Sequence, residues 1–336
     1  MKTILRTFVG CTAILFGTAC MGAVKYVPEN MKVELSLKVP GNNAVNYKLH
    51  PDKLENSYFD YEWRSDNKLP ITVFHKVEER DSCMRLTVQL TAAQDVYFNY
   101  RQLLSTGYRH DNCQFYMPGF WYRRNLRSPK KAPSFHTSDS WLVREDRLSA
   151  PLTGIFSEKE KRFMTVNRLD DFSMDALATH KEGEIILSGK TSLGFTGFEN
   201  QQGIAMLSFG FPYREAPKSY IRKLTLAPEV EAFQLMKKGE SVLLTWEIME
   251  SGADDFSDFI QHTWEHCYDT YAPKPVENSY SIADMKQVLS CFFVNSLVDN
   301  QPLVYNSGIH LKVSDCERNG QAEVGFIGRV LLNAFN

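Results

Sequence analysis

The sequence predicts a mainly β protein: a large antiparallel β-sandwich, followed by a helical linker and the first helices of an α/α array. Two observations support this fold class. Up to about residue 250, apolar and polar residues mostly alternate, as half-buried strands require. Beyond that point, apolar residues recur every three or four positions, as amphipathic helices require. The hydrophobic period therefore changes near residue 250.

The clearest strand is 31–39, where Val33 and Leu35 share one face and Lys32 and Glu34 the other. Similar patterns predict strands at 71–77, 84–90, 96–100, 163–166, 184–187, 204–209, 221–226 and 242–248. Polar turns separate these segments, and no helix lies between them. They therefore favour a sandwich of two extensive antiparallel sheets, spanning 25–250, over a parallel α/β fold.

Two long loops are predicted within the sandwich, at 118–140 and 193–202. The first is rich in Arg, Lys and Pro, and the second in Gly, Phe and polar residues. Long loops on a rigid scaffold are where binding groups usually lie.

The helical part begins with a helix at about 254–271, which Pro273 and Pro275 interrupt, so that 251–279 is predicted as a linker. We expect the Phe256, Phe259, Ile260, Thr263, Cys267 and Tyr271 side chains to form its apolar stripe. A second helix begins at Ser281, whose hydroxyl is expected to cap the Asp284 amide. A third is expected at 321–336. We interpret 280–336 as the start of an incomplete α-helical domain.

The N-terminus has the features of a signal peptide spanning 1–19. Lys2 and Arg6 precede an apolar segment that is too short for a stable membrane span. The sequence Gly17-Thr18-Ala19-Cys20 is similar to a bacterial lipobox, with glycine in place of the usual leucine. Lipidation of Cys20 and plain cleavage near it both remain open. Either predicts an exported protein of the periplasm or cell envelope; lipidation would anchor it to the outer or inner membrane.

The net charge of −2 provides no field that would attract a polyanion, so nucleic acid is not expected as a partner. The cysteines show no C-x-x-C pair and therefore no zinc ribbon. A disulfide between Cys83 and Cys113 and buried free thiols both remain open. No phosphate-binding or dinucleotide-binding motif is present, and no cofactor is predicted.

One segment matches a metal-binding motif. His262, Glu265 and His266 fit H-x-x-E-H, in which two imidazoles bind zinc and the glutamate acts as a base. A helical projection places them opposite the stripe that contains Phe256 and Cys267, as is typical of a solvated face. No metal site is therefore favoured here, and a zinc metallopeptidase is the third hypothesis for function.

Aromatic and charged residues gather around 120–147. Aromatic rings stack on the apolar face of a pyranose, and carboxylates and guanidinium groups bind its hydroxyls or a uronate carboxylate. The candidate carbohydrate-binding residues are Trp121, Tyr122, Arg123, Arg144, Glu145 and Asp146. The alternative is a network of ion pairs that fixes the long loop to the sandwich. The residues alone leave both interpretations open.

This layout resembles bacterial exported glycoside hydrolases of the six-hairpin type. The resemblance lies in an export signal, a large sandwich, a linker with Pro-x-Pro and two segments, W-L-V-R-E-D-R-L-S (141–149) and A-E-V-G-F-I-G-R (322–329). It implies a supersandwich-like domain before an (α/α)6 barrel, and poly- or oligosaccharide substrates, with uronic acids among them. It assigns no catalytic residue. The chain departs from that family by ending where the barrel would begin.

The leading hypothesis is that the chain is the N-terminal part of an exported carbohydrate-active hydrolase. It would lack most of the catalytic barrel, and whether it is active at this length remains open. The alternative is a non-catalytic glycan-binding or structural sandwich of the cell envelope.

Overall fold

The computed structural model divides the chain into two compact units, Met1–Tyr271 and Ala272–Asn336. The described residues are 27–80, 83–126, 131–170, 182–222, 225–274, 280–296, 305–306, 309–310, 317–318 and 322–323. The predicted signal peptide and the lipidation site Cys20 lie outside them.

The first unit is mainly β, which confirms the predicted fold class. One antiparallel sheet has the order β1 (Met31–Lys38), β6 (Val96–Arg109), β14 (Ile204–Phe211), β13 (Phe195–Gln201) and β9 (Trp141–Arg144). The other has the order β3 (Tyr61–Arg64), β4 (Ile71–Glu79), β5 (Cys83–Ala92), β17 (Ser241–Gly252), β11 (Arg162–Arg168), β10 (Leu152–Ser157), β7 (Cys113–Met117) and β8 (Trp121–Arg123). The strand β2 (Val45–Lys53) pairs with both β1 and β3 and so connects the two sheets.

Three further strands, β12 (Gly183–Ile186), β15 (Arg214–Arg222) and β16 (Thr225–Met236), extend the first sheet. The β15 strand pairs with β9, and β16 pairs with β6. Among the described strands, β12 and β16 form a parallel pair, which the antiparallel prediction did not include. Three short 3₁₀ helices are η1 (Pro28–Asn30), η2 (His110–Asn112) and η3 (Glu145–Arg147).

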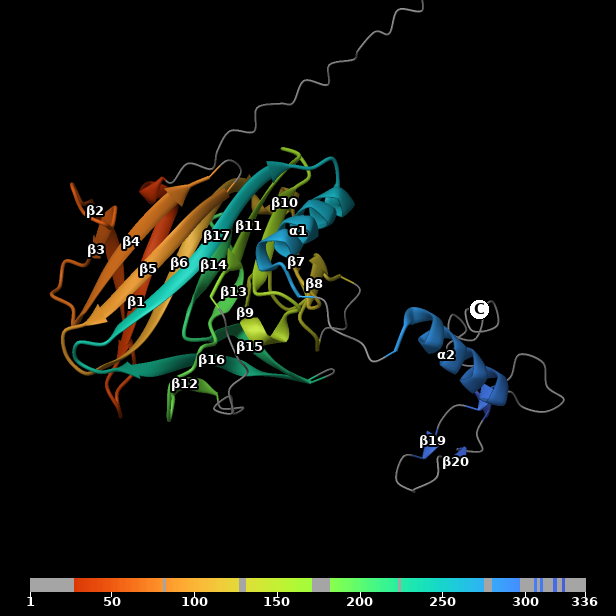
Figure 1. Cartoon of the computed structure of the whole chain (residues 1–336). Coiled ribbons are helices and arrows are strands. Elements are labelled where there is room, and N and C mark those ends of the chain that lie inside the picture. The colour runs from red at the N-terminus through yellow and green to blue at the C-terminus, as the bar shows by residue number, and fades with distance from the viewer. Residues whose placement is uncertain are drawn as a thin grey trace, which may run out of the picture. The chain divides into compact units, whose positions relative to one another are not determined.

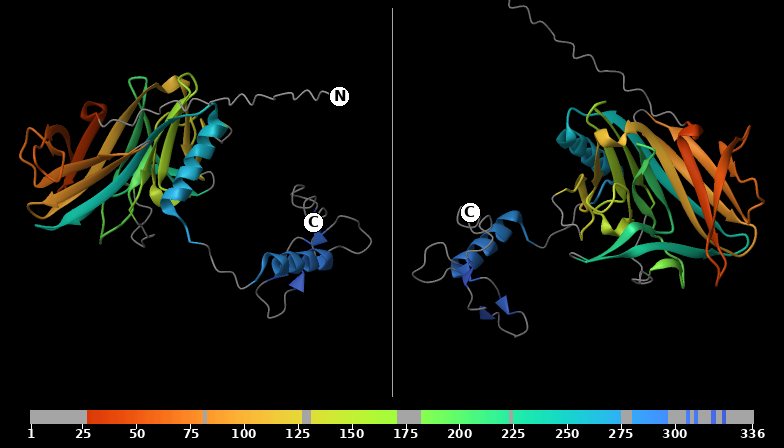
Figure 2. Two further views of the ribbon diagram at one scale, coloured as in Figure 1. Left: turned by 45° about the horizontal axis from the view of Figure 1, so that its top comes forward. Right: turned by 180° about the vertical axis from the view of Figure 1, so that it is seen from behind.

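The core lies between the two sheets, which pack face to face (Figures 1 and 2). Val33 and Leu35 of β1 point inward and are fully buried, as the alternating pattern predicts. From the other sheet, Trp246 of β17 meets Phe209 of β14 with ring centroids 5.2 Å apart. Burial of each such side chain stabilises the fold by about 1.5–3 kcal/mol.

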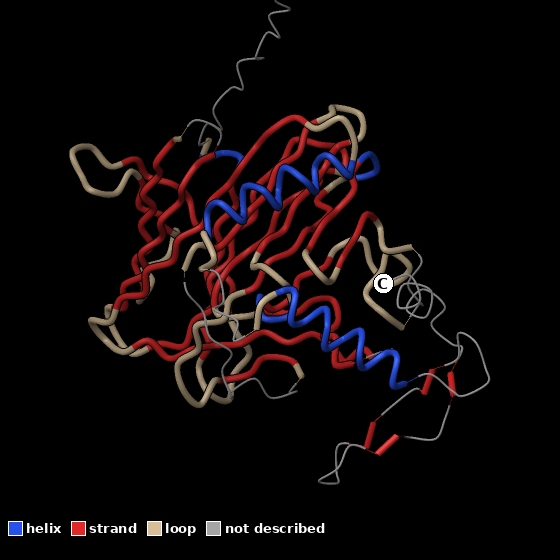
Figure 3. The backbone as a smooth tube through the Cα atoms, turned by 45° about the vertical axis from the view of Figure 1, so that its right-hand side comes forward, coloured by secondary structure: helices blue, strands red, loops and turns tan. Residues whose placement is uncertain are grey.

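The helix α1 (Phe256–Tyr271) covers the outer face of the second sheet (Figure 3). Its Phe259 ring contacts Phe156 of β10 and Phe163 of β11, at centroid distances of 5.9 and 5.0 Å. Beneath the ring lies Gly154, where an added Cβ would be 2.6 Å from Phe259. The helix was predicted as part of a linker. It instead belongs to the sandwich unit, because its buried stripe packs on the sheet.

Two local predictions were wrong. The predicted loop 193–202 contains β13, which is hydrogen-bonded on both sides and mostly buried. The predicted strand 221–226 is instead divided between the end of β15 and the start of β16, where Arg222 pairs with Thr225. The other predicted loop, 118–140, contains the short strand β8.

In the second unit, α2 (Ile282–Ser296) begins as predicted. The Ser281 hydroxyl accepts the Asp284 amide at 3.1 Å, and the Asp284 carboxylate accepts the Ser281 amide at 3.2 Å. Two short antiparallel pairs follow among the described residues, β18 (Tyr305–Asn306) with β21 (Ala322–Glu323) and β19 (Ile309–His310) with β20 (Glu317–Arg318). The predicted helix 321–336 therefore does not include Ala322 and Glu323, whose backbone pairs with β18; its remainder lies outside the described residues. No helix in the described part of the chain is long and apolar enough to cross a membrane.

Candidate functional site

The predicted carbohydrate-binding residues divide between the core, a buried charge network and the surface. Trp121 belongs to the core. Its ring is fully buried against Trp141 and Phe198, and its Nε1 donates to the Arg123 carbonyl at 2.9 Å. Trp121 therefore has no free face on which a sugar could stack, and its proposed role was wrong. Alternation along β8 points Trp121 inward and leaves Tyr122 half exposed.

Arg144 and Asp146 form an ion pair with each other. Arg144 Nε donates to Asp146 Oδ1 at 3.0 Å, and the guanidinium group lies over the Tyr213 ring. Both side chains are more than nine-tenths buried. The next arginine, Arg147, is paired with Glu215 of β15. These contacts match the alternative that the sequence left open, in which the charged segment fixes the chain to the sandwich.

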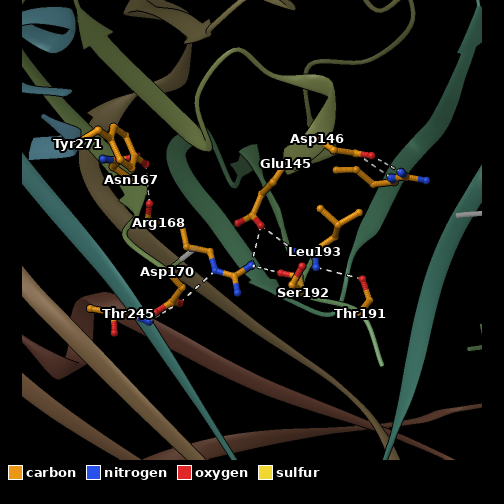
Figure 4. Close-up of polar contacts among 12 residues, drawn as sticks. Glu145, Asp146, Asn167, Arg168, Asp170, Thr191, Ser192, Leu193, Thr245 and Tyr271 are labelled. Atoms are coloured by element: carbon orange, nitrogen blue, oxygen red, sulfur yellow. Dashed lines mark hydrogen bonds and ion pairs between the residues drawn. The ribbon is translucent and has the colours of Figure 1, made fainter. Parts of the chain in front are cut away.

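Glu145 is fully buried at the centre of the charge network (Figure 4). Its Oε2 accepts hydrogen bonds from Arg168 Nη1 and from the Gly194 amide, both at 2.7 Å. Burial raises the pKa of Glu145, and the Arg168 charge opposes this increase. An added Cβ at Gly194 would lie 3.0 Å from Glu145 Oε1 and 2.9 Å from Arg168 Nη1, so the close approach requires glycine. Because solvent does not reach this carboxylate, it is placed to hold η3 and not to meet a ligand.

Arg168 extends the network to β17 and α1. Its Nε donates to Asp170 Oδ2 at 3.1 Å, and the same oxygen accepts the Thr245 amide at 2.8 Å. The Arg168 carbonyl accepts the Tyr271 hydroxyl at 2.6 Å, which fixes the end of α1 (Figure 4). The network thus joins η3, β11, β17 and α1 and serves as a scaffold. None of these links beyond the charged segment 144–147 was predicted.

Large aromatic side chains are exposed on β8 and α1; one of them, Tyr271, is 40% exposed and is held through its hydroxyl by Arg168. Tyr122 is 51% exposed, Trp264 41% and Tyr268 65%. Tyr116 lies between β8 and α1. Its ring centroid is 5.4 Å from that of Tyr122, and the polar groups of the Trp264 and Tyr122 side chains both lie near its hydroxyl. Trp264 and Tyr268 are one helical turn apart on α1, so they share a face. We call Tyr122, Trp264 and Tyr268 the aromatic surface.

Arg123 borders the aromatic surface. Its guanidinium group lies 4.7 Å from the centre of the Phe256 ring, and its Nη1 donates to Gln114 Oε1 at 2.9 Å. Arg123 is exposed, and its φ of +57° lies in the left-handed region, which is strained for an arginine. Of the predicted site residues, Tyr122 and Arg123 are therefore the two that remain available to a ligand. Trp264 and Tyr268 were not predicted.

The H-x-x-E-H motif lies on α1, and its two imidazoles have separate carboxylate partners. His266 Nε2 lies 2.6 Å from Glu247 Oε1, and His262 Nε2 lies 3.5 Å from Asp258 Oδ1. Glu265 accepts a hydrogen bond from the Gln261 amide. Within the described ranges, no three His, Cys, Asp or Glu side chains are grouped to hold a metal ion. The geometry gives zinc chemistry no support.

The disulfide hypothesis was wrong for Cys83 and Cys113, which are buried free thiols. They lie on β5 and β7, and the strands β17, β11 and β10 separate them in the sheet. The Cys83 thiol contacts Glu247 Oε2, and the Cys113 thiol contacts the Arg109 carbonyl.

No protein-family model matches the chain, and no curated protein matches it. Among solved structures, it is similar to a polysaccharide lyase with 14% identity and a TM-score of 0.33, over 70% of this chain and 27% of the lyase. A galactose mutarotase related enzyme from Lactobacillus acidophilus gives 9% identity and a TM-score of 0.34, over 66% of this chain and 80% of that one. A GH36 alpha-galactosidase from Geobacillus stearothermophilus gives 11% identity and a TM-score of 0.28, over 73% and 33%.

These three neighbours are carbohydrate-active enzymes by name. The chain spans about a quarter of the lyase and a third of the galactosidase. At TM-scores this low, the similarities carry no argument about function, which has to come from the molecule itself.

Proposed function

We propose that the sandwich binds carbohydrate through the aromatic surface, as the N-terminal part of an exported carbohydrate-active hydrolase. The observation that carries the binding proposal is the exposure of Tyr122, Trp264 and Tyr268 beside Arg123. Export rests on the sequence of 1–19, and attachment to a membrane would require lipidation of Cys20. The hydrolase assignment rests on the resemblance of the chain's layout to six-hairpin enzymes.

The chemistry of the aromatic surface suits a sugar. Aromatic rings left in water are energetically unfavourable, and the C–H face of a pyranose covers them without requiring the sugar to give up its hydroxyl hydration. The Tyr268 hydroxyl supplies hydrogen bonds at a ring edge. Arg123 adds a planar donor that can bind two neighbouring oxygens. These properties favour an oligosaccharide over a purely apolar ligand.

The proposed role is binding and support of a cleft, without a catalytic residue in the described sandwich. A general acid or nucleophile has to reach the glycosidic bond. Glu145 cannot reach such a bond, because its carboxylate is fully buried and accepts a hydrogen bond from Arg168.

Affinity electrophoresis in gels that contain soluble polysaccharides tests this proposal. The proposal predicts that a retarding polysaccharide is found and that Trp264→Ala weakens the retardation roughly tenfold, as expected for loss of a central aromatic contact. Tyr58→Ala is the matched control, because Tyr58 is 69% exposed but lies in the loop between β2 and β3. Equal retardation of wild type and Trp264→Ala would reject the aromatic surface as the binding site.

A further inference from the structure

A cleft of about 450 Å³ opens where β2 leaves one sheet for the other. The strand pairs with β1 up to Leu49, opposite Val33, and pairs with β3 from His50 onward, with Pro51 opposite Trp63. The strands β1 and β3 separate at this point, so side chains from both faces of β2 line the opening. We call this the corner cleft; its lining includes Lys32, Lys48, Leu49, His50, Pro51 and Trp63. The strands β2 and β3, which contribute to its lining, lie at the opposite end of the sandwich from α1 (Figure 1).

The Trp63 indole at this cleft lacks a hydrogen-bond partner. Trp63 is 3% exposed, and its Nε1 is buried without an acceptor among the described residues. The His75 ring lies 5.0 Å away, centroid to centroid, but its Nε2 is engaged with the Tyr100 hydroxyl at 2.7 Å. A buried donor without an acceptor costs about 1–3 kcal/mol. An acceptor on a bound ligand would remove that cost.

Lys48 is the cation of the cleft that is available to an anion. Lys32 and Lys48 both line the cleft, but Lys32 donates to the Gln201 side chain, whereas Lys48 makes no ion pair with a described side chain. Of the two lining carboxylates, Glu34 lies 3.0 Å from Arg101 Nη1, a guanidinium group that also pairs with Glu199, and Glu29 is the other. The walls beside these groups are apolar, formed partly by Leu49 and Pro51. The volume falls within the range of small-molecule sites, about 300–1,000 Å³.

We propose that the corner cleft binds a small organic carboxylate, whose anionic group pairs with Lys48 and whose body lies against Leu49, Pro51 and Trp63. Because Nε1 is buried, the Trp63 ring has to shift on binding for its indole N–H to donate a hydrogen bond to the carboxylate. The carboxylate can belong to an acidic sugar or to a compact apolar acid, since both present an anion on a six-membered ring. This site is separate from the aromatic surface and does not depend on the function proposed there.

Titration of the ¹⁵N-labelled protein, monitored at the indole N–H signals of its five tryptophans, tests the proposal. Trp63→Phe assigns the Trp63 signal by its disappearance. The probes are glucuronate, cyclohexanecarboxylate and glucose, and the last is a neutral control for the sugar ring. The expected result is a Trp63 shift with at least one carboxylate and none with glucose. A shift with glucuronate alone identifies an acidic sugar as the source, and a shift with cyclohexanecarboxylate alone identifies an apolar acid.

Lys48→Met is expected to weaken the response roughly tenfold or more, as loss of a charge-assisted contact predicts. Lys53→Met is the matched control, because Lys53 is an exposed lysine on β2 that does not line the cleft. The proposal is overturned if neither carboxylate moves the Trp63 signal, if glucose moves it equally, or if Lys48→Met binds like wild type. Since these readouts are local to Trp63, failure of carbohydrate binding at the aromatic surface would leave them unchanged.

Discussion

His266 Nε2 on α1 lies 2.6 Å from Glu247 Oε1 on β17, and this contact fixes the helix to the sheet. Glu247 is nearly buried, and its other oxygen contacts the Cys83 thiol. The hydrogen bond to Glu247 raises the pKa of His266, although burial opposes this increase. Burial alone would raise the pKa of Glu247, but the hydrogen bond and charge of His266 outweigh it, and the pKa is lowered.

The first prediction concerns the pH dependence of this contact. Because the pKa of His266 is raised in the folded state, its contribution to the free energy of unfolding is fully present below the ordinary pKa of 6.5. This contribution is lost as the pH rises through the folded-state pKa. Because the pKa of Glu247 is lowered in the folded state, its contribution to the free energy of unfolding is fully present above the ordinary pKa of 4.5. This contribution is lost as the pH falls through the folded-state pKa. The pair therefore stabilises the protein most between about pH 4.5 and 6.5.

Urea unfolding of wild type and His266→Gln across this range measures the contribution. We expect the variant to be less stable by about 1.5 kcal/mol near the centre of the range and the difference to shrink on both sides. His262→Gln is the control, because His262 is 41% exposed and its carboxylate partner lies 3.5 Å away. A difference between wild type and His266→Gln that stays constant with pH would show that the contact does not titrate as described.

A second prediction concerns the packing of α1 against the sheet. Gly154→Ala places a Cβ 2.6 Å from the Phe259 ring and 3.2 Å from Thr165 Cγ2, so the helix or the strand has to move. We expect a loss of about 1–3 kcal/mol in the free energy of unfolding. At Gly252 the nearest atom is 3.7 Å from an added Cβ, and Gly252→Ala is expected to be nearly neutral. Equal unfolding curves for the two variants would contradict the described packing of Phe259.

A third prediction concerns the buried charge network. Arg168→Leu leaves Glu145 buried without its cation, which is expected to destabilise the protein by about 3–5 kcal/mol. Arg109→Leu removes an exposed ion pair with Asp111, where both side chains are more than 60% exposed, and should leave stability nearly unchanged. Thermal unfolding monitored by circular dichroism compares the two. A near-neutral Arg168→Leu would mean that the network does not hold η3 to the sheet.

The alternating strands were predictable because one face is buried and the other meets solvent, as in β1 and β5. The strands β9 and β10 are buried at every position, because further elements cover their outer faces. A strand without a solvated face shows no alternation of apolar and polar residues in the sequence. This explains why these strands were not predicted and why β13 was predicted as a loop.

The site was only partly predictable. Tyr122 and Arg123 were identified by composition, but the inward direction of Trp121 depends on the pairing of β8 with β7, which the sequence does not specify. Trp264 and Tyr268 carried a signal that was not used. They are large apolar side chains at an i, i+4 spacing outside the apolar stripe of α1, and such residues are exposed when the stripe packs.

Binding of an oligosaccharide library to wild type and to the Tyr122→Ala/Trp264→Ala double variant tests the central claim most directly. Both side chains are at least 41% exposed, so the double variant is expected to fold, and its unfolding curve verifies this. The account predicts that wild type binds a defined set of glycans and that the folded double variant loses them, whereas Tyr58→Ala retains them. Retention of the same glycans by the double variant, or absence of any bound glycan for wild type, would contradict it.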